Sequence, residues 1–346
     1  MMLYKRSSAR LVLVLVAIVA LSGCESITKH LPGASSRNSV AVEHNLLSGR
    51  VGTNGPILAV KVDDTPQAHP QIGIDQADVV YIEQVEGGLT RLATIFSSVI
   101  PPRIGPVRSA RISDIDLLAQ YGHVAFAYSG AQTKLFPVID AANLENLGAQ
   151  RESEALYPRD PLRIAPVNLV LQADLLMAKL TEQNVTIAHA KSPGWTFGAE
   201  PVGGDPIISV AMKWPANAYT ATWSPGESRW LMFHAGSADL ADSGKQLGPT
   251  TLVIQMVSIT PSIYHDKFGG VTPFSATIGQ GTGYILRDGK VFAGVWNRAD
   301  AASGTTWTTT DGTPIPFAPG QIWVALTDNP PVFTHPAPSA SPTPTK

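Results

Sequence analysis

The sequence is short of cysteine and of charge. Cys24 is the single cysteine among 346 residues, so no disulfide can form within the chain. Charged residues make up 15% of the sequence, and the formal net charge is −2. A chain without an excess of positive charge lacks the electrostatic field that holds nucleic acid. We therefore predict no nucleic-acid partner.

The signatures of familiar catalysts are also missing. The chain contains no Gly-x-Ser-x-Gly elbow, phosphate-binding P-loop, His-Glu-x-x-His pair or dinucleotide-binding fingerprint. Its eight histidines are scattered, with no close pair. The sequence therefore names no reaction, and we predict no cofactor.

No hydrophobic run is long enough to span a bilayer, which takes about 20 residues. The apolar residues 11–21 follow three basic residues and precede small ones, a pattern typical of a secretion signal. The run ends in Leu21-Ser22-Gly23-Cys24, which resembles a bacterial lipoprotein cleavage box. The resemblance implies cleavage before Cys24 and a lipid on its thiol, with an uncleaved signal anchor as the alternative. We thus predict that residues 1–24 are a lipoprotein signal peptide and lipobox. The membrane is then a partner through the lipid, and the protein lies on the outer face of the bacterial cytoplasmic membrane.

Both ends of the remaining chain have low-complexity composition. Residues 25–55 mix Ser, Gly, Asn and charge without periodicity, which predicts a flexible tether. Residues 329–346 are rich in Pro, Ser and Thr, which predicts a disordered tail. The roughly 270 residues between them exceed one typical domain.

The first part of this region, residues 56–192, has short apolar runs that alternate with amphipathic segments. This alternation predicts a mixed α/β (α+β) N-terminal domain. We expect strands at residues 57–62, 78–85, 89–96 and 123–128, and helices at residues 114–121, 131–143 and 172–183.

The second part, residues 207–328, follows a linker at residues 193–206 and has little helical periodicity. We predict a mostly β C-terminal domain that forms a compact unit of its own. The expected strands are residues 207–214, 219–223, 230–234, 251–257, 283–287, 291–296 and 321–327. All seven tryptophans lie between Trp195 and Trp323. Core packing is their expected role, because aromatic side chains are commonly buried, with stacking on sugar rings as the alternative.

Several ordered motifs resemble the YerB-like bacterial lipoproteins. They are Glu86-Gly87-Gly88, Ile104-Gly105-Pro106-Val107-Arg108-Ser109-Ala110-Arg111, Gly294-Val295-Trp296-Asn297-Arg298 and Gly320-Gln321-Ile322-Trp323. The resemblance implies an N-terminal and a C-terminal domain of unknown function, and no reaction. Val167 and Tyr128-Ser129-Gly130 stand where the resemblance leads us to expect histidines. These departures argue against a general histidine catalyst.

Residues 86–111 carry four arginines, whereas no lysine occurs between Lys61 and Lys134. Arginine without lysine indicates planar, forked recognition of phosphate or carboxylate. We predict that Arg91, Arg108 and Arg111 point into one cleft. The predicted ligand-binding residues are Arg91, Arg103, Arg108, Ser109, Arg111, Asp63 and Glu83.

Internal ion pairing is the alternative interpretation of these arginines. Residues 57–127 contain five cations and eight carboxylates, among them Asp63, Asp64, Glu83 and Glu86. Asp63 and Asp64 end a predicted strand and are weak candidates for a divalent cation. Adjacent acids more commonly form a solvated turn, so we predict no metal site.

The function that these patterns favour is a non-catalytic, membrane-anchored protein that binds an anionic ligand of the cell envelope. One alternative is a metal-assisted phosphotransferase or hydrolase acting on phosphate-linked envelope precursors, with Asp63 or Asp64 placing the cation. The other is an envelope assembly scaffold that uses the β-rich half as its interaction surface. The sequence identifies no protein partner.

Overall fold

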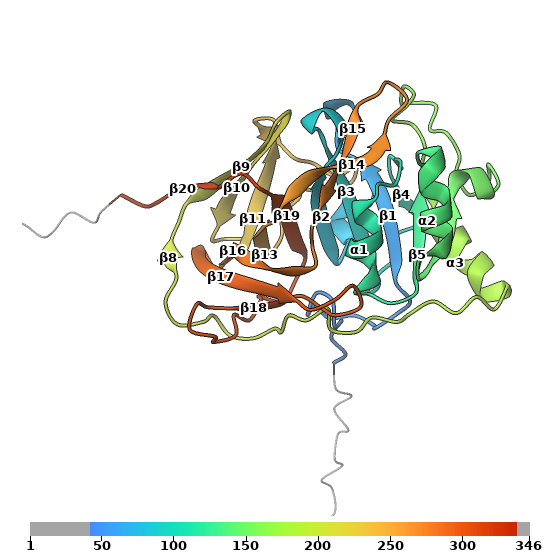
Figure 1. The fold of residues 1–346 in the computed structure, drawn as a ribbon. Helices are drawn as coiled ribbons and strands as arrows, with labels where there is room; N and C mark the ends of the chain where they lie inside the picture. The colour runs from blue at the N-terminus through green and yellow to red at the C-terminus, as the bar shows by residue number, and fades with distance from the viewer. Residues whose placement is uncertain (1–41, 338–346) are drawn as a thin grey trace, which may run out of the picture. The chain divides into compact units, whose positions relative to one another are not determined.

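The structure is a computed structural model that describes residues 42–337 of the chain. Strands outnumber helices among these residues. The three α-helices that the structure describes all end before residue 183 (Figure 1). The predictions for Cys24, for the signal peptide and for residues 25–41 concern residues outside this range.

An 11-stranded sheet forms the centre of the fold. Its strand order is β18 (Thr306–Thr308), β17 (Lys290–Arg298), β16 (Gly279–Arg287), β13 (Thr251–Met256), β19 (Ile322–Thr327), β2 (Val79–Gln84), β3 (Thr90–Phe96), β1 (Leu58–Asp63), β5 (Val124–Tyr128) and β6 (Leu144–Gly148), with β8 (Asp205–Pro206) beside β17. β2 and β3 form an antiparallel hairpin, whereas β1, β5 and β6 run parallel to one another.

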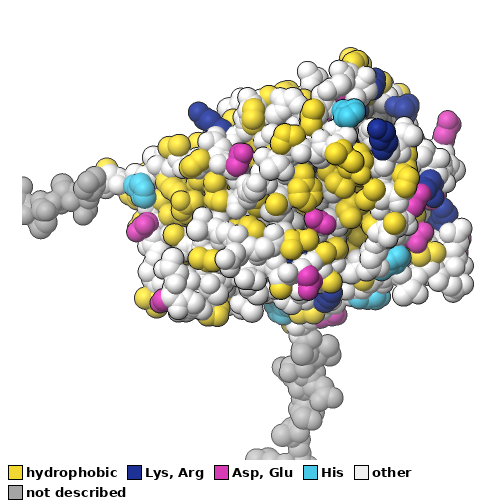
Figure 2. All heavy atoms as spheres, in the orientation of Figure 1, with side chains coloured by type: hydrophobic (Ala, Val, Ile, Leu, Met, Phe, Trp, Pro, Cys, Tyr) yellow, Lys and Arg dark blue, Asp and Glu magenta, His cyan; other side chains and the backbone are white. Residues whose placement is uncertain are grey.

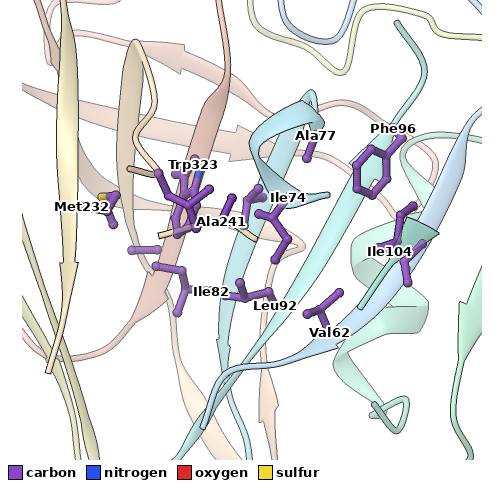
Figure 3. Packing of buried hydrophobic residues seen from close by; sticks show 14 of the residues in the cluster. Val62, Ile74, Ala77, Ile82, Leu92, Phe96, Ile104, Met232, Ala241 and Trp323 are labelled. Atoms are coloured by element: carbon purple, nitrogen blue, oxygen red, sulfur yellow. The ribbon is translucent and has the colours of Figure 1, made fainter. Parts of the chain in front are cut away.

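The central strands of this sheet are buried on both faces, because a hydrophobic cluster packs against each face. Successive side chains of a strand point to opposite faces, so each strand contributes to two separate clusters. Val62, Ile82, Leu92 and Trp323 belong to the cluster that also contains Met232 of the second sheet (Figure 3). The residues between them, such as Tyr81, belong to the other cluster.

Smaller elements cover the two faces. The second sheet has the order β12 (Ser237–Ala238), β11 (Arg229–His234), β10 (Asn217–Ser224), β9 (Ser209–Trp214) and β20 (Val332–Thr334). The remaining strand pairs are β14 (Ile259–His265) with β15 (Val271–Ser275), and β4 (Arg103–Ile104) with β7 (Leu171–Gln172). The helices are α1 (Ser113–Ala119), α2 (Phe136–Ala141) and α3 (Ala173–Glu182), with 3-10 turns η1 (Pro66–Ala68), η2 (Ile74–Gln76), η3 (Glu86–Gly88), η4 (Thr133–Leu135) and η5 (Ala149–Arg151).

The prediction of two separate compact units is wrong. β19, from the end of the chain, pairs in parallel with β2 on one side and with β13 on the other. Figure 1 shows β19 beside β2, so one sheet runs through both halves. The backbone groups along β2 and β19 satisfy one another, and separation of the halves would leave a long unpaired edge on each.

The boundaries of the predicted tether and tail also need correction. Residues 42–55 are part of the folded body, because Leu47 is fully buried and its carbonyl accepts a hydrogen bond from Trp195 Nε1 at 3.0 Å. At the other end, β20 lies within the predicted disordered tail and pairs with β9. Phe333 of β20 meets the ring of Tyr284 edge-on, with centroids 5.1 Å apart.

The tryptophans lie mainly in the core. Trp230 and Trp323 are fully buried, and Trp195, in the predicted linker, stacks on Phe317 with ring centroids 5.4 Å apart. The strands expected from the sequence did not include the β14–β15 hairpin. Several of its side chains face solvent, so it lacks the apolar alternation of a half-buried strand.

Candidate functional site

Three of the four predicted arginines line one cavity of about 470 Å³. Arg91 lies on β3, directly opposite Asp63 of β1, so the two side chains share a face of the sheet. Arg108 and Arg111 lie on the segment after β4, which folds back along β1. The amide of Arg108 donates to the carbonyl of Lys61 at 2.8 Å. The fold thus brings a strand and a distant loop to the same cavity.

Two of these arginines are held by carboxylates. Arg111 donates to Glu86 Oε2 from Nε at 2.9 Å and from Nη2 at 2.6 Å, and both side chains are largely buried. Arg108 donates from Nε to Asp63 Oδ2 at 2.5 Å, with 27% of its side chain exposed. Internal ion pairing therefore explains part of the arginine cluster.

Arg91 differs from its two neighbours. Among the described residues, its hydrogen-bond acceptor is the carbonyl of Ser109, 3.1 Å from Nη1, and no carboxylate pairs with it. Burial lowers the pKa of Arg91, and the positive charges of Arg111 and Arg108 lower it further, to about 9. Arg91 remains a cation at neutral pH, in a place where positive charge is unfavourable. An anion in the cavity would relieve this.

The β14–β15 hairpin supplies the opposite wall of the cavity. His265, Asp266, Lys267 and Phe268 line it, and Thr272 Oγ1 donates a hydrogen bond to Glu86 Oε1. Figure 2 shows Lys, Arg and His side chains beside hydrophobic ones where Figure 1 draws this hairpin. Four cationic side chains and two carboxylates line the cavity in all.

The carboxylates of the cavity are held in their charged form. Burial opposes this for Glu86, but hydrogen bonds from Arg111 and Thr272 keep its pKa below the usual range. The pKa of Asp266 is lowered chiefly because the Gly270 amide donates to its carboxylate. Neither carboxylate can therefore act as a proton donor near neutral pH.

Arg103 lies apart from the other three arginines. It lines a second cavity of about 730 Å³, and its closest acid there is Asp160, 3.4 Å from Nη2. Many of the residues around this second cavity are apolar, including Ile72, Leu162 and Ile164. Arg108 is the one lining residue that both cavities share.

Glu83 is the cross-strand neighbour of Arg91 but does not line the first cavity. Its carboxylate accepts from Lys61 Nζ at 2.7 Å, and the same ammonium bonds Asp114 at 2.6 Å. Burial and the Asp114 carboxylate raise the pKa of Glu83 to about 8, against the effect of Lys61. Glu83 therefore lies beside Arg91 in the sheet, but its carboxylate pairs with the buried Lys61 of β1, on the far side of β3, and not with an arginine.

Asp63 and Asp64 do not converge. Asp63 bonds Arg108, whereas Asp64 lies in a buried cluster with His69 and His234. Asp64 Oδ1 accepts from Tyr219 at 2.5 Å, and Oδ2 accepts from Thr90. The shared cation site considered for the two aspartates is therefore not formed.

The cluster around Asp64 has the contacts of an ion-pair network. His69 Nδ1 lies 2.9 Å from Asp239, and its Nε2 lies 3.5 Å from Asp64. Burial alone would lower the pKa of His69, but these two carboxylates raise it to about 9. The His69 and His234 rings stack nearly parallel, so their nitrogen lone pairs do not converge on one point. The geometry favours a charged imidazole between two carboxylates over a metal centre.

Sequence reasoning missed the hairpin residues of the first cavity. Asp266-Lys267-Phe268-Gly269-Gly270 ends in two glycines, which is a turn pattern between extended segments. That pattern predicts a hairpin. Its placement over Arg91 and Arg111 depends on tertiary contacts such as Ser275 N to Ser113 Oγ at 3.0 Å.

Comparison with models of known protein families identifies the family of this chain. Residues 46–186 match the model for the protein of unknown function (DUF3048) N-terminal domain, and residues 208–324 match the DUF3048 C-terminal domain. Together these matches cover most of the chain, which therefore belongs to the DUF3048 family. The two matches are separated by residues 187–207, although one sheet continues across this boundary.

A relative in this family is the Bacillus subtilis (strain 168) protein named "Putative lipoprotein YerB". It is 22% identical over 271 residues, which are 78% of this chain and 80% of the relative. The crystal structure of YerB from Bacillus subtilis matches with a TM-score of 0.71 and 20% identity, over 83% of this chain and 97% of that one. The likeness shows a shared fold. Within residues 42–337, the helices are too short or too polar to span a membrane.

Proposed function

We propose that this chain is a lipid-anchored protein of the outer face of the bacterial cytoplasmic membrane. The support is the signal sequence that ends at Cys24 and the lipoprotein name of its relative YerB. We further propose that it binds an anionic envelope ligand, with a phosphate group held by Arg91, Arg108 and Arg111.

The observation that carries the binding proposal is Arg91. Arg111 and Arg108 are each paired with an acid, so the fold needs no ligand to stabilise them. Arg91 is half-buried, lies near two other cations and, although the charges of Glu86 and Asp63 act on it, has no paired carboxylate among the described residues. Such a charge is costly unless a counter-charge reaches it. A phosphate accepts several forked hydrogen bonds from guanidinium groups and fits this need.

The geometry favours binding over catalysis. The phosphotransferase alternative requires a cation held by Asp63 or Asp64 beside the phosphate, yet Asp63 is bonded to Arg108 and Asp64 faces a different cluster. The hydroxyl of Ser109 lies 3.4 Å from that of Ser129, which supplies no base. We therefore assign Ser109 the role of a hydrogen-bond donor to the ligand through its hydroxyl.

Calorimetric titration with inorganic phosphate and with pyrophosphate tests the proposal. We expect saturable binding and a rise in melting temperature, compared with sodium chloride at equal ionic strength to separate binding from screening. Arg91→Met keeps much of the apolar stem and removes the charge, so it should fold and bind at least about tenfold more weakly. Arg151→Met is the matched control: it also removes one arginine charge, but from an exposed ion pair with Asp140. Equal affinity in parent and Arg91→Met would reject the proposal.

A further inference from the structure

The second cavity borders the arginine cavity through a single side chain. Arg108 lines both cavities and donates to Asp63 through Nε. Among the described residues, no acceptor pairs with its Nη1 or Nη2. A ligand group held by Arg108 could therefore carry a substituent from the first cavity into the second.

The two cavities differ in chemistry. The first is lined by Arg91, Arg111 and Lys267 besides Arg108. The second, of about 730 Å³, is bordered by apolar residues of the segment that leads into η2 and of the loop that precedes β7, together with charged side chains that include Arg103 and Asp160. Two of the apolar residues, Leu162 and Ile164, leave 92% and 85% of their surface exposed. A ligand that covers these two side chains would remove apolar surface from water, which favours binding.

We propose that the ligand is a lipid phosphate, with its phosphate on Arg91, Arg108 and Arg111 and its apolar chain in the second cavity against Leu162 and Ile164. This inference rests on the function proposed above and adds the class of ligand. The shared Arg108 places the two groups on adjacent sides of one guanidinium. The cationic side chains of the first cavity complement the phosphate, and the apolar part of the second, at Leu162 and Ile164, complements the chain.

A series of alkyl phosphates, from methyl to octyl phosphate, tests this below the concentrations at which they form micelles. The probes are titrated into the chain that begins at Val42, since the contacts among residues from Val42 onward make one compact unit. We expect affinity to rise by about fourfold for each methylene that becomes buried, until the cavity is filled.

The double variant Leu162→Ser with Ile164→Ser removes the apolar contact. Both side chains are exposed, so the variant should fold as the parent does, and its affinity for inorganic phosphate should not change. Its gain in affinity with chain length should be largely lost. The double variant Val202→Ser with Ile263→Ser changes two other exposed aliphatic residues and should keep the full gain.

Three results would overturn the inference while leaving phosphate binding in place. The first is affinity that does not depend on chain length. The second is a chain-length gain that survives in the Leu162 and Ile164 variant. The third is self-association of the parent that this variant abolishes, which would assign the cavity to a second copy of the chain. Absence of any phosphate binding would reject the proposed function and this inference together.

Discussion

Arg111 donates two hydrogen bonds to Glu86, from Nε and from Nη2, and both are directed at the same carboxylate oxygen. The exposed fractions of the two side chains are 10% and 8%. Arg91 lies in the same cavity without such a partner among the described residues. The cavity therefore contains one arginine that is paired with a carboxylate and one, Arg91, that feels the charges of Glu86 and Asp63 without a direct carboxylate contact among the described residues.

Arg111→Met and Arg91→Met should consequently differ in stability. Loss of Arg111 leaves Glu86 buried with only its Thr272 hydrogen bond, which should cost about 3–5 kcal/mol of unfolding free energy. Loss of Arg91 removes repulsion from Arg108 and Arg111, so its cost should be below about 1 kcal/mol. Urea unfolding in phosphate-free buffer measures both. Equal losses would contradict the distinction between the two arginines.

The buried group of Glu83, Lys61 and Asp114 predicts a dependence of stability on pH. A glutamate carboxyl in water has an ordinary pKa of 4.5, and burial in the folded protein raises the pKa of Glu83 to about 8. Between these values the folded state binds a proton that the unfolded state has lost, so stability falls as pH rises through this window. The expected loss is on the order of a few kcal/mol, since each pKa unit corresponds to about 1.4 kcal/mol.

Glu83→Gln keeps the shape of the side chain and cannot ionise. We expect the parent to lose more unfolding free energy than this variant between about pH 5 and about pH 8, because one ionisation is removed. Chemical denaturation at matched ionic strength compares the two proteins. Parallel pH profiles would show that Glu83 does not titrate in this range.

Local patterns predicted much of the first half of the sheet. The apolar runs that became β1, β2 and β3 follow one another along the chain, and Gly87-Gly88 marks the turn between β2 and β3. Convergence of Arg91, Arg108 and Arg111 also followed from the sequence, since the Pro- and Gly-rich segment between them can fold back.

Contacts between distant residues decided what the sequence did not predict. The pairing of β2 with β19 joins segments from opposite ends of the folded body, and neither strand carries a local mark of its neighbour. Arg103 pairs with Asp160, and Glu83 pairs with Lys61, although other residues of opposite charge lie as close or closer to each of them in the sequence. Selection among such partners depends on burial and strand register, which appear only in the folded chain.

Cys24→Ser tests the lipid anchor. We expect the variant to leave the membrane fraction or to remain unprocessed, because the apolar residues 11–21 are too few to serve as a stable span. The measurement is detergent partitioning together with the mature mass. Ser22→Ala retains the thiol and a small residue and serves as the control. A mature mass and partitioning equal to those of the parent would end the lipoprotein interpretation.

The continuous sheet predicts that the two halves of the chain do not fold separately. Residues 42–192 alone would expose the edge of β2, and residues 193–337 alone would expose the edge of β19. Arg298 would also lose its hydrogen bond to the carbonyl of Asp116, at 2.5 Å. Unpaired edges and opened core faces favour aggregation or disorder, so neither fragment should unfold cooperatively by itself.

Mixing the two fragments should restore cooperative unfolding, because the β2–β19 pairing and both core clusters then reform. Breaking the backbone is a separate effect and needs its own control. A protease site inserted beside Val202, which is fully exposed, allows the folded chain to be cut after it has formed. The cut protein should remain a native complex in size-exclusion chromatography. A dispersed amide spectrum and a sharp unfolding transition from residues 42–192 alone would instead show that the first half is an independent domain, despite the shared sheet.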